Sequence, residues 1–503
     1  MNPFSYLEAL RLAAPETALA VAALAVLFAD LGGMRGESLR HRAILGAGIT
    51  AVGGAMALLW LGFAPGYGTI AEGVLVTSPL TQLVKAGLVL LTLLVAGLSL
   101  DPRFTGHVGE YFSLLLLGTI GMMVLVSTQD LLMLFLALEL TSLPLYVLAG
   151  FNKRDRASAE AALKYFFFGS VAAAFLLFGF SLLYGVAGST RLPVIAAAVA
   201  LKPPDALTLV ALVCVVMGFG FKVAAVPFHL WAPDAYEGAP TPAAAFIASG
   251  SKVASFAVFG IVLAQGLGPM AGGADWHGFT TGWLPLLAVV ALASMLLGNL
   301  AAIAQRSVKR LLAYSAIAHA GYLLLGLMAL ATPANRPAAL AAILYYAITY
   351  ALSTVGAFGI VAVVERATGS DAADGFNGLA RRSPALALCL MIFLLSLAGI
   401  PPLAGFLGKF YVFVAATRAG DGSLSLFWLV LVAIALSVVS LYYYLKLLKR
   451  AYVLPPDGAV PATRPDVMEF VVIGMTAAAV LGLGVFPRAL LEPLALAIQQ
   501  AGF

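Results

Sequence analysis

Charged residues are scarce in this chain. Of its 503 residues only 10% are Asp, Glu, Lys or Arg, whereas 62% are hydrophobic. Soluble globular domains carry about 25% charged residues, so the composition excludes a soluble enzyme. The longest polar connection, residues 365–384, is too short to form a domain of its own. The sequence therefore predicts an all-α polytopic membrane protein.

Cysteine is nearly absent as well. Cys214 and Cys389 stand alone within apolar stretches, so they offer no disulfide framework, metal pair or iron–sulfur ligand set. The sequence has no Walker phosphate loop and no dinucleotide-binding glycine fingerprint after a strand. We therefore expect no cofactor and no metal in the chain itself.

Long apolar runs, by contrast, are plentiful. A membrane-spanning helix needs about 20 mostly apolar residues, and by that length the chain has about 14 spans. They lie near residues 14–31, 43–63, 79–99, 111–127, 130–150, 161–185, 206–228, 240–265, 284–304, 309–331, 338–364, 385–416, 425–447 and 468–486. Glu8 and Glu16 flank the first run where a signal peptide would be basic, so we expect this run to be a retained helix.

The basic residues are unevenly distributed between the loops. Of the 28 Lys and Arg, 17 lie in odd-numbered loops, 6 lie in even-numbered loops and termini, and five lie inside predicted spans. Because cytoplasmic loops are enriched in Lys and Arg, we predict both termini on the opposite, outer side. The net charge of +5 is thereby explained by orientation, and no nucleic-acid partner is expected.

Charges inside apolar spans are the candidate functional residues, since each costs roughly 3 kcal/mol on insertion scales. Glu139 lies near the middle of the span 130–150. It could be a neutral acid bonded to Thr141 or Ser142 within a helix interface. A glutamine would fill that role without a titratable proton, so we favour a functional role.

Two lysines leave more ordinary alternatives. Lys164 follows Glu160 by four residues, which is the favourable order for an ion pair on one helix face. It either forms a surface pair or points inward. Lys85 lies in the first third of its span, where a long stem can reach the membrane surface. We therefore expect Lys85 to have a structural role.

Residues 219–252 combine two buried lysines with four intervening prolines. Lys222 precedes Pro227 by five residues, and His229 follows in the predicted break. Proline removes a backbone donor and interrupts a helix at membrane depth. Lys222 could simply neutralise a helix end, whereas Lys252, near mid-helix, does not fit that alternative. A buried lysine near a carboxylate can exchange protons as their pairing changes.

A second interruption with a buried lysine, Lys409, occurs in residues 396–410. Such paired interruptions indicate an internal transporter repeat. Each falls in the fourth span of a five-span block, so consecutive blocks must be inverted. We predict one transmembrane domain, 1–503, made of residues 1–104 (helices one to three), 105–266 (first repeat, helices four to eight), 284–450 (second repeat, helices nine to thirteen) and 465–503. His319, in the second block, is either a satisfied core residue or a relay member.

Together these stretches resemble the antiporter-like membrane subunits of respiratory complex I, and among them the N type. The stretches that carry the resemblance are residues 137–140, 158–165, 221–242, 310–322 and 397–410. One sister subunit has a glutamate where this chain has Lys409. Another, the L type, continues with a long lateral helix, whereas this sequence stops about 17 residues after the last span.

The resemblance implies a role for each matching residue. Glu139 would pair with Lys222, and Lys164 would modulate that pair. Lys252 would link two half-channels, and Lys409 would lie on the exit side. His229, in the predicted break, and His319, near the membrane centre, are further candidates.

The resemblance also implies a function. The chain would be a proton-translocating subunit of a bacterial inner-membrane NADH–quinone oxidoreductase, with periplasmic termini. FMN, iron–sulfur clusters and quinone would belong to partner subunits. Its partners would be an adjacent antiporter-like subunit, small membrane-arm subunits and the lipid bilayer. A sodium/proton antiporter subunit of the same fold and a non-pumping structural subunit are the alternatives.

Overall fold

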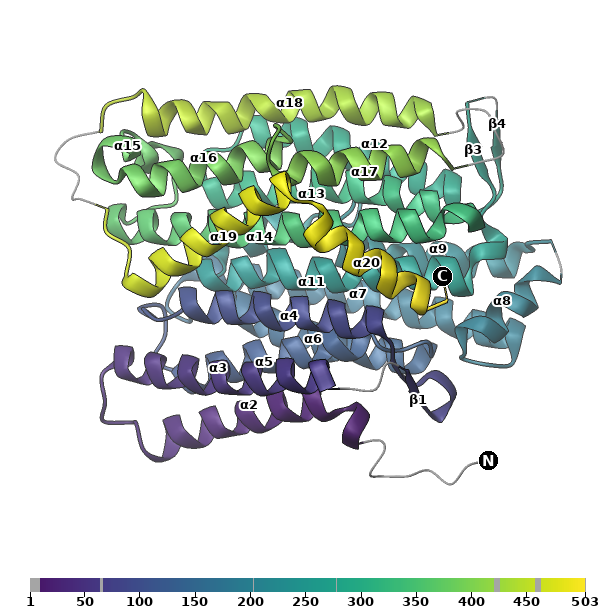
Figure 1. The fold of residues 1–503 in the computed structure, drawn as a ribbon, viewed down its shortest axis with the longest axis horizontal. Helices are drawn as coiled ribbons and strands as arrows, with labels where there is room; N and C mark the ends of the chain where they lie inside the picture. The colour runs from purple at the N-terminus through teal and green to yellow at the C-terminus, as the bar shows by residue number, and fades with distance from the viewer. Residues whose placement is uncertain are drawn as a thin grey trace.

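The protein is a bundle of long helices that lie side by side along one direction (Figure 1). The computed structural model describes residues 10–63, 67–201, 203–276, 278–419, 426–456 and 463–502. Lys202, one of the six basic residues of the even loops and termini, lies outside them. Within the described ranges, twelve helices are long and apolar enough to cross a membrane. The predicted all-α membrane fold is confirmed.

The first three crossings are α2 (Ala14–Gly32), α3 (Leu39–Phe63) and α4 (Pro79–Leu98). The hairpin β1 (Gly68–Ile70) and β2 (Leu75–Thr77) precedes α4, with Gly68 opposite Thr77. Ser78 and Thr81 form a reciprocal capping box that begins α4. The sequence did not predict this hairpin, because strands of three residues are too short to show a period.

The first block contains one interrupted crossing and one short extra helix. Its helices are α5 (Val108–Leu125), α6 (Leu131–Ala149), α7 (Arg156–Ala187), α8 (Leu192–Ala200), α9 (Ala206–Lys222), α10 (Trp231–Gly238) and α11 (Thr241–Ile261). The predicted break in the span near 206–228 is confirmed, since α9 ends at Lys222 and α10 begins eight residues after Val223. The short helix α8 was not predicted.

The second block repeats this plan. Its helices are α12 (Trp283–Ile303), α13 (Val308–Met328), α14 (Arg336–Thr368), α15 (Leu379–Arg382), α16 (Pro384–Ala398), α17 (Ala404–Thr417) and α18 (Phe427–Tyr452). The hairpin β3 (Gly273–Asp275) and β4 (Gly278–Thr280) precedes α12. The predicted span 385–416 is two half-helices, α16 and α17. The two broken crossings thus supply the last two of the predicted fourteen.

The last crossing, α19 (Val467–Val485), is followed by α20 (Arg488–Gln500), which packs against α4 and α14. The start of α2 and the end of α20 lie at the same end of the bundle as both hairpins (Figure 1). We call this end, with residues 68–77 and 273–280, the hairpin end. The opposite end, with residues 33–38 and 369–383, is the loop end. An even number of crossings follows.

The centre of the bundle is α11, all of whose residues are buried. It packs against α14 on one side and against α4 and α5 on the other. A helix that is enclosed on all sides must satisfy its polar side chains inside the protein. Lys252 lies on this helix, so its surroundings are set by neighbouring helices and not by lipid.

Candidate functional site

The first break holds Lys222, the last residue of α9. Its Nζ donates a hydrogen bond to the Ser142 hydroxyl on α6, and Ser142 donates to the Leu138 carbonyl one turn earlier. The amides of Val223 and Ala225 close the helix end by bonding to carbonyls of α9. Lys222 is thus joined to α6 through a serine.

Glu139 lies one turn before Ser142 on the same side of α6 and is half-buried. Its charge acts on Lys222, but among the described residues no ion pair joins the two, because Ser142 is the neighbour of the ammonium. Glu139 is flanked on its own face by the exposed Leu136 and Leu143. It therefore lies near the outer surface of the bundle, and it acts on Lys222 through its charge and not through the expected ion pair.

Lys164 belongs to a charged network at the loop end of the first block. Its Nζ lies 2.6 Å from both Glu160 Oε1 and Asp234 Oδ2. Asp234 Oδ1 accepts a hydrogen bond from Arg310 Nη1 at 2.6 Å, and Arg310 also donates to Glu237 at 2.8 Å. The network connects α7, α10 and α13. Sequence reasoning missed Asp234, Glu237 and Arg310, although Asp234 stands directly after a proline in the break.

His229 lies between α9 and α10 and is buried. Its Nδ1 has no hydrogen-bond partner in the part of the chain that the structure describes. The structure does not bring His229 into contact with Lys222 or Lys252.

Lys252 is 2% exposed at the middle of α11. Its Nζ donates to the Ala316 carbonyl on α13 at 2.5 Å and lies 5.3 Å from the centre of the Tyr350 ring on α14. No carboxylate among the described residues forms an ion pair with it. The ammonium is held by a carbonyl and an aromatic face, which favour a cation without fixing it in place by an opposite charge.

His319 lies one turn beyond Ala316 on α13. Its Nδ1 is 2.6 Å from the Tyr346 hydroxyl, and its Nε2 is 3.4 Å from that of Tyr444. Its ring centre is 4.9 Å from that of Tyr350 and 5.8 Å from that of Tyr322. Both ring nitrogens have hydrogen-bond partners, so His319 is satisfied within the core. It also lies next to the tyrosine rings that contact two lysines.

Lys409, on α17, is 4% exposed. Its Nζ donates to the carbonyls of Leu397 and Ala398, each at 3.0 Å, and to the Ser437 hydroxyl at 2.8 Å. The carbonyls are the last of α16, so the lysine neutralises a helix end in the second break. Gly399 has φ of +88°, and a Cβ there would lie 3.1 Å from Lys409 Cδ. Both the positive φ and the closeness of the Lys409 side chain require glycine at that break.

Five side chains connect the two blocks across the bundle. Lys409 Nζ lies 4.9 Å from the centre of the Tyr322 ring, just as Lys252 lies against Tyr350. Both lysines act electrostatically on His319. We call Lys252, Tyr350, His319, Tyr322 and Lys409 the central row. Groups of this kind can accept, hold and pass on protons.

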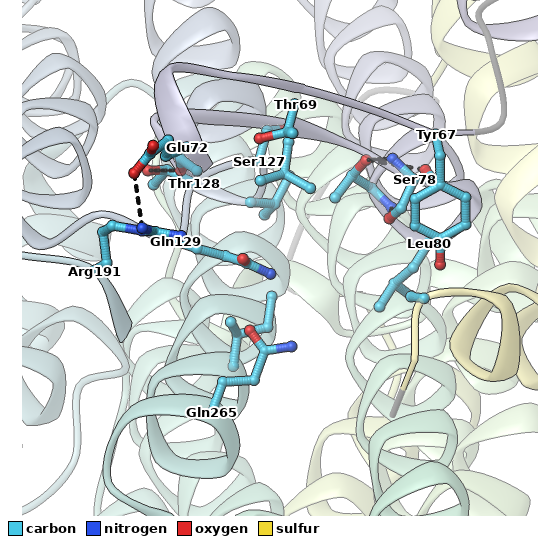
Figure 2. Close-up of a pocket in the computed structure, with 16 residues that line it drawn as sticks. Tyr67, Thr69, Glu72, Ser78, Leu80, Ser127, Thr128, Gln129, Arg191 and Gln265 are labelled. Carbon is cyan, nitrogen blue, oxygen red and sulfur yellow. Dashed lines mark hydrogen bonds and ion pairs between the residues drawn. The ribbon is translucent and has the colours of Figure 1, made fainter. Parts of the chain in front are cut away.

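A cavity of about 500 Å³ at the hairpin end lies apart from the central row. Figure 2 shows Glu72 of the hairpin reaching Arg191, an ion pair of 2.7 Å, and Gln265 below them. Glu72 has a positive φ of 56°. Within the described residues no group of three His, Cys, Asp or Glu side chains could hold a metal ion.

A protein-family model described as NADH:quinone oxidoreductase/Mrp antiporter, transmembrane, matches residues 128–437. NADH-quinone oxidoreductase subunit N 2 of Acidobacterium capsulatum is 51% identical over 98% of this chain and 99% of that protein. Subunit N of Desulfovibrio desulfuricans is 40% identical over 95% and 94%. The F420H2 dehydrogenase subunit N of Methanosarcina mazei is 40% identical over 86% and 85%.

Solved structures show the same fold. A chain of respiratory complex I from Thermus thermophilus with bound aureothin is 33% identical, with a TM-score of 0.77 over 96% of this chain and 100% of that one. A chain of the Mrp complex from a Dietzia species has a TM-score of 0.77 at 23% identity, over 97% of both chains. At that identity the likeness concerns the fold alone.

Proposed function

This chain belongs to the NADH:quinone oxidoreductase/Mrp antiporter transmembrane family, and we propose that its central row carries protons across the membrane. Within the family it is a membrane subunit of NADH–quinone oxidoreductase, as its full-length relatives are named. The chain is therefore one subunit of an enzyme, an oxidoreductase that translocates protons. Its partners are the other membrane-arm subunits, as in the complexes that contain its structural neighbours.

The observation that carries the proposed route is the pair of buried lysines, Lys252 and Lys409, each held by backbone carbonyls and a tyrosine ring. A proton reaches Lys222 from the loop end and passes to Lys252. It then crosses by Tyr350, His319 and Tyr322 to Lys409 and leaves at the hairpin end. A neutral lysine amine accepts a proton and an ammonium releases one, so transfer needs only water or hydroxyl groups between the basic atoms.

Glu139 and Lys164 act on this route through Lys222. Glu139 lies near the outer surface between exposed leucines, where a neighbouring subunit in the membrane arm can change its surroundings. A change in its charge alters the free energy of the ammonium of Lys222. Lys164 is held by Glu160 and Asp234, so its charge is balanced while Glu139 varies. His229 is a further candidate at the break.

The redox chemistry belongs to other chains in this proposal. FMN, iron–sulfur clusters and quinone are assigned to partner subunits, and this chain supplies the proton path. The loop end carries the odd-numbered loops and their 17 basic residues, so it faces the cytoplasm of a bacterial inner membrane. Both termini then lie in the periplasm. The predicted organisation into helices one to three, two repeats and a last helix fits this route.

Substitution of Lys222 by Ala, or of Glu139 by Gln, tests the proposal in the assembled complex. We expect fewer protons translocated per electron, because each change removes a charge on which loading depends. Proton uptake by membrane vesicles is measured together with the rate of electron transfer. Lys446→Ala, which removes an exposed lysine at the loop end, is the matched control.

The same measurement separates the alternatives. A normal ratio of protons to electrons in both variants would exclude Lys222 and Glu139 from the proton route. A normal ratio in every lysine variant would favour a structural subunit. Proton transport that stops when sodium is replaced by potassium would favour a sodium/proton antiporter. A structural subunit gains nothing from the insertion cost of several buried lysines, which supports the transporting role.

A further inference from the structure

A cavity of about 310 Å³ opens at the loop end, where α10 meets α11. Residues 238–242 form one wall, and Lys309 of α13 and Glu365 of α14 lie across from them. We call it the junction cavity. It opens at the beginning of α11, the enclosed helix that carries Lys252. The cavity therefore lies at the start of the helix that carries Lys252, and Lys222 is not among its lining residues.

Glu365 is the carboxylate best placed to take up a proton there. Its Oε1 lies 3.1 Å from Lys309 Nζ, and its Oε2 accepts a hydrogen bond from the Thr241 hydroxyl. Lys309 and Thr241 are buried, whereas the Glu365 side chain is 33% exposed. Glu365 thus lines the cavity with a partly exposed side chain whose two oxygens contact buried residues.

The other carboxylates of the cavity are held differently. Glu469 binds Arg366 through both oxygens, at 2.7 and 2.6 Å, and Asp101 lies 3.5 Å from the same arginine. Asp155 caps the first turn of α7 by accepting from the amide of Ala157. Glu469 is thus held by an arginine and Asp155 by a helix end, whereas Glu365 is bonded to the first residue of α11, Thr241.

One face of α14 leads from the cavity to Lys252. Glu365, Phe358, Thr354 and Tyr350 are separated by seven, four and four residues, so they share a face of the helix. At 1.5 Å per residue the face is about 22 Å long. It ends at Tyr350, whose ring lies 5.3 Å from Lys252 Nζ.

A buried hydroxyl without a partner lies beside this face. The Tyr236 hydroxyl on α10 is fully buried and has no hydrogen-bond partner among the described residues. Its ring centre is 6.0 Å from that of Phe358. Buried polar groups are almost always satisfied by protein or by internal water, so water is expected next to Tyr236, between the cavity and Lys252.

We infer that Glu365 collects protons for a second route, which runs from the junction cavity between α10, α11 and α14 to Lys252. This inference rests on the proposed function. A hydronium ion in the cavity protonates the Glu365 carboxylate and becomes water. The carboxylic acid then gives that proton to water near Tyr236 and Thr354, and the last water protonates the neutral Lys252 amine. Lys252 therefore has two inputs, one by Lys222 and one by Glu365.

Three substitutions in the assembled complex test this route: Glu365→Gln, Thr354→Val and Tyr236→Phe. With one of two inputs lost, we expect the contribution of this subunit to the ratio of translocated protons to electrons to fall by roughly a factor of two. Electron transfer in the presence of an uncoupler should stay near its normal rate. A residue that only supports the fold would instead lower assembly and both rates together. Asp155→Asn is the matched control, since it neutralises a carboxylate of the same cavity while keeping the cap.

Comparison with Lys222→Ala separates the two proposals. If the double variant Lys222→Ala with Glu365→Gln loses more transport than either single variant, the two inputs are separate, as inferred. A normal ratio in Glu365→Gln beside a lowered one in Lys222→Ala overturns the second route and leaves the proposed function standing. Normal ratios in both overturn both. If Glu365→Gln fails to assemble, Thr354→Val, which keeps the side-chain shape, decides by the same ratio.

Discussion

Two buried lysines in different regions of this protein have opposite surroundings. Lys85, on α4, is 1% exposed, and its Nζ lies 2.7 Å from Glu16 Oε1 on α2. Lys252, in the central row, is equally buried but is held by a carbonyl and a tyrosine ring. Burial alone therefore does not mark a proton-carrying lysine, and the partner of the ammonium distinguishes the two cases.

The physical difference lies in what deprotonation leaves behind. If Lys85 lost its proton, the carboxylate of Glu16 would remain charged and unpaired in an apolar region, which is unfavourable by several kcal/mol. If Lys252 lost its proton, no opposite charge would be left. Deprotonation of the paired lysine therefore has an electrostatic cost that deprotonation of the carbonyl-held lysine does not have. Lys85 also lies outside residues 128–437, which match the family model.

The largest effect is expected from Lys252→Met. Both proposed inputs meet at this residue, so proton translocation by this subunit should stop while the shape of the side chain is kept. The measurement is protons translocated per electron in membrane vesicles. The matched control removes a buried charge pair from the other region: Glu16→Gln combined with Lys85→Met should retain translocation. If the control variant lost as much proton translocation as Lys252→Met, the proposed difference between the two regions would be wrong.

A smaller and different effect is expected from Glu16→Gln alone. Lys85 would then be a buried charge without its counter-ion, which costs about 3–5 kcal/mol. The amount of assembled complex and its resistance to heat inactivation should fall, but the complex that does assemble should keep its normal ratio of protons to electrons. Adding Lys85→Met should restore most of the lost stability. A lowered ratio in assembled Glu16→Gln complex would instead make Lys85 part of the proton path.

Much of this contrast was beyond sequence reasoning. The prediction that Lys85 reaches toward the membrane surface is wrong, because it considered only the depth of Lys85 within its span. Its partner Glu16 lies on another helix, and no local pattern connects residues so far apart. The same limit explains why Ser142 was missed as the neighbour of Lys222, and why Arg310 was not joined to Asp234.

Features with a local cause were predicted well. Apolar length located the crossings, and the prolines located both breaks, because a missing backbone donor interrupts a helix wherever it occurs. Lys409 was placed beside the second break for the same reason. The ends of the half-helices were missed, since apolar residues continue beyond Lys222 and across Gly399 without a change in hydropathy. The hairpins and α8 are too short for their period to be recognised.

Lys164 provides an intermediate case and the smallest predicted effect. It is held by carboxylates, as Lys85 is, but its side chain is 39% exposed. Asp234→Asn removes one of its two partners and one of the two partners of Arg310. Because exposed ion pairs contribute about 0.2–1 kcal/mol, and Glu160 and Glu237 remain, we expect the rate of proton translocation to fall by less than about fivefold.

A second single variant, Glu160→Gln, sharpens the comparison, because it removes the other partner of Lys164. Arg310 loses a contact only in the first variant. If the effect comes from the charge balance of Lys164, both variants should slow translocation to a similar extent. If the effect comes from the link between α10 and α13, only Asp234→Asn should slow translocation. Loss as complete as in Lys252→Met would contradict the small contribution expected of a solvent-screened pair, and would place Asp234 on the proton path itself.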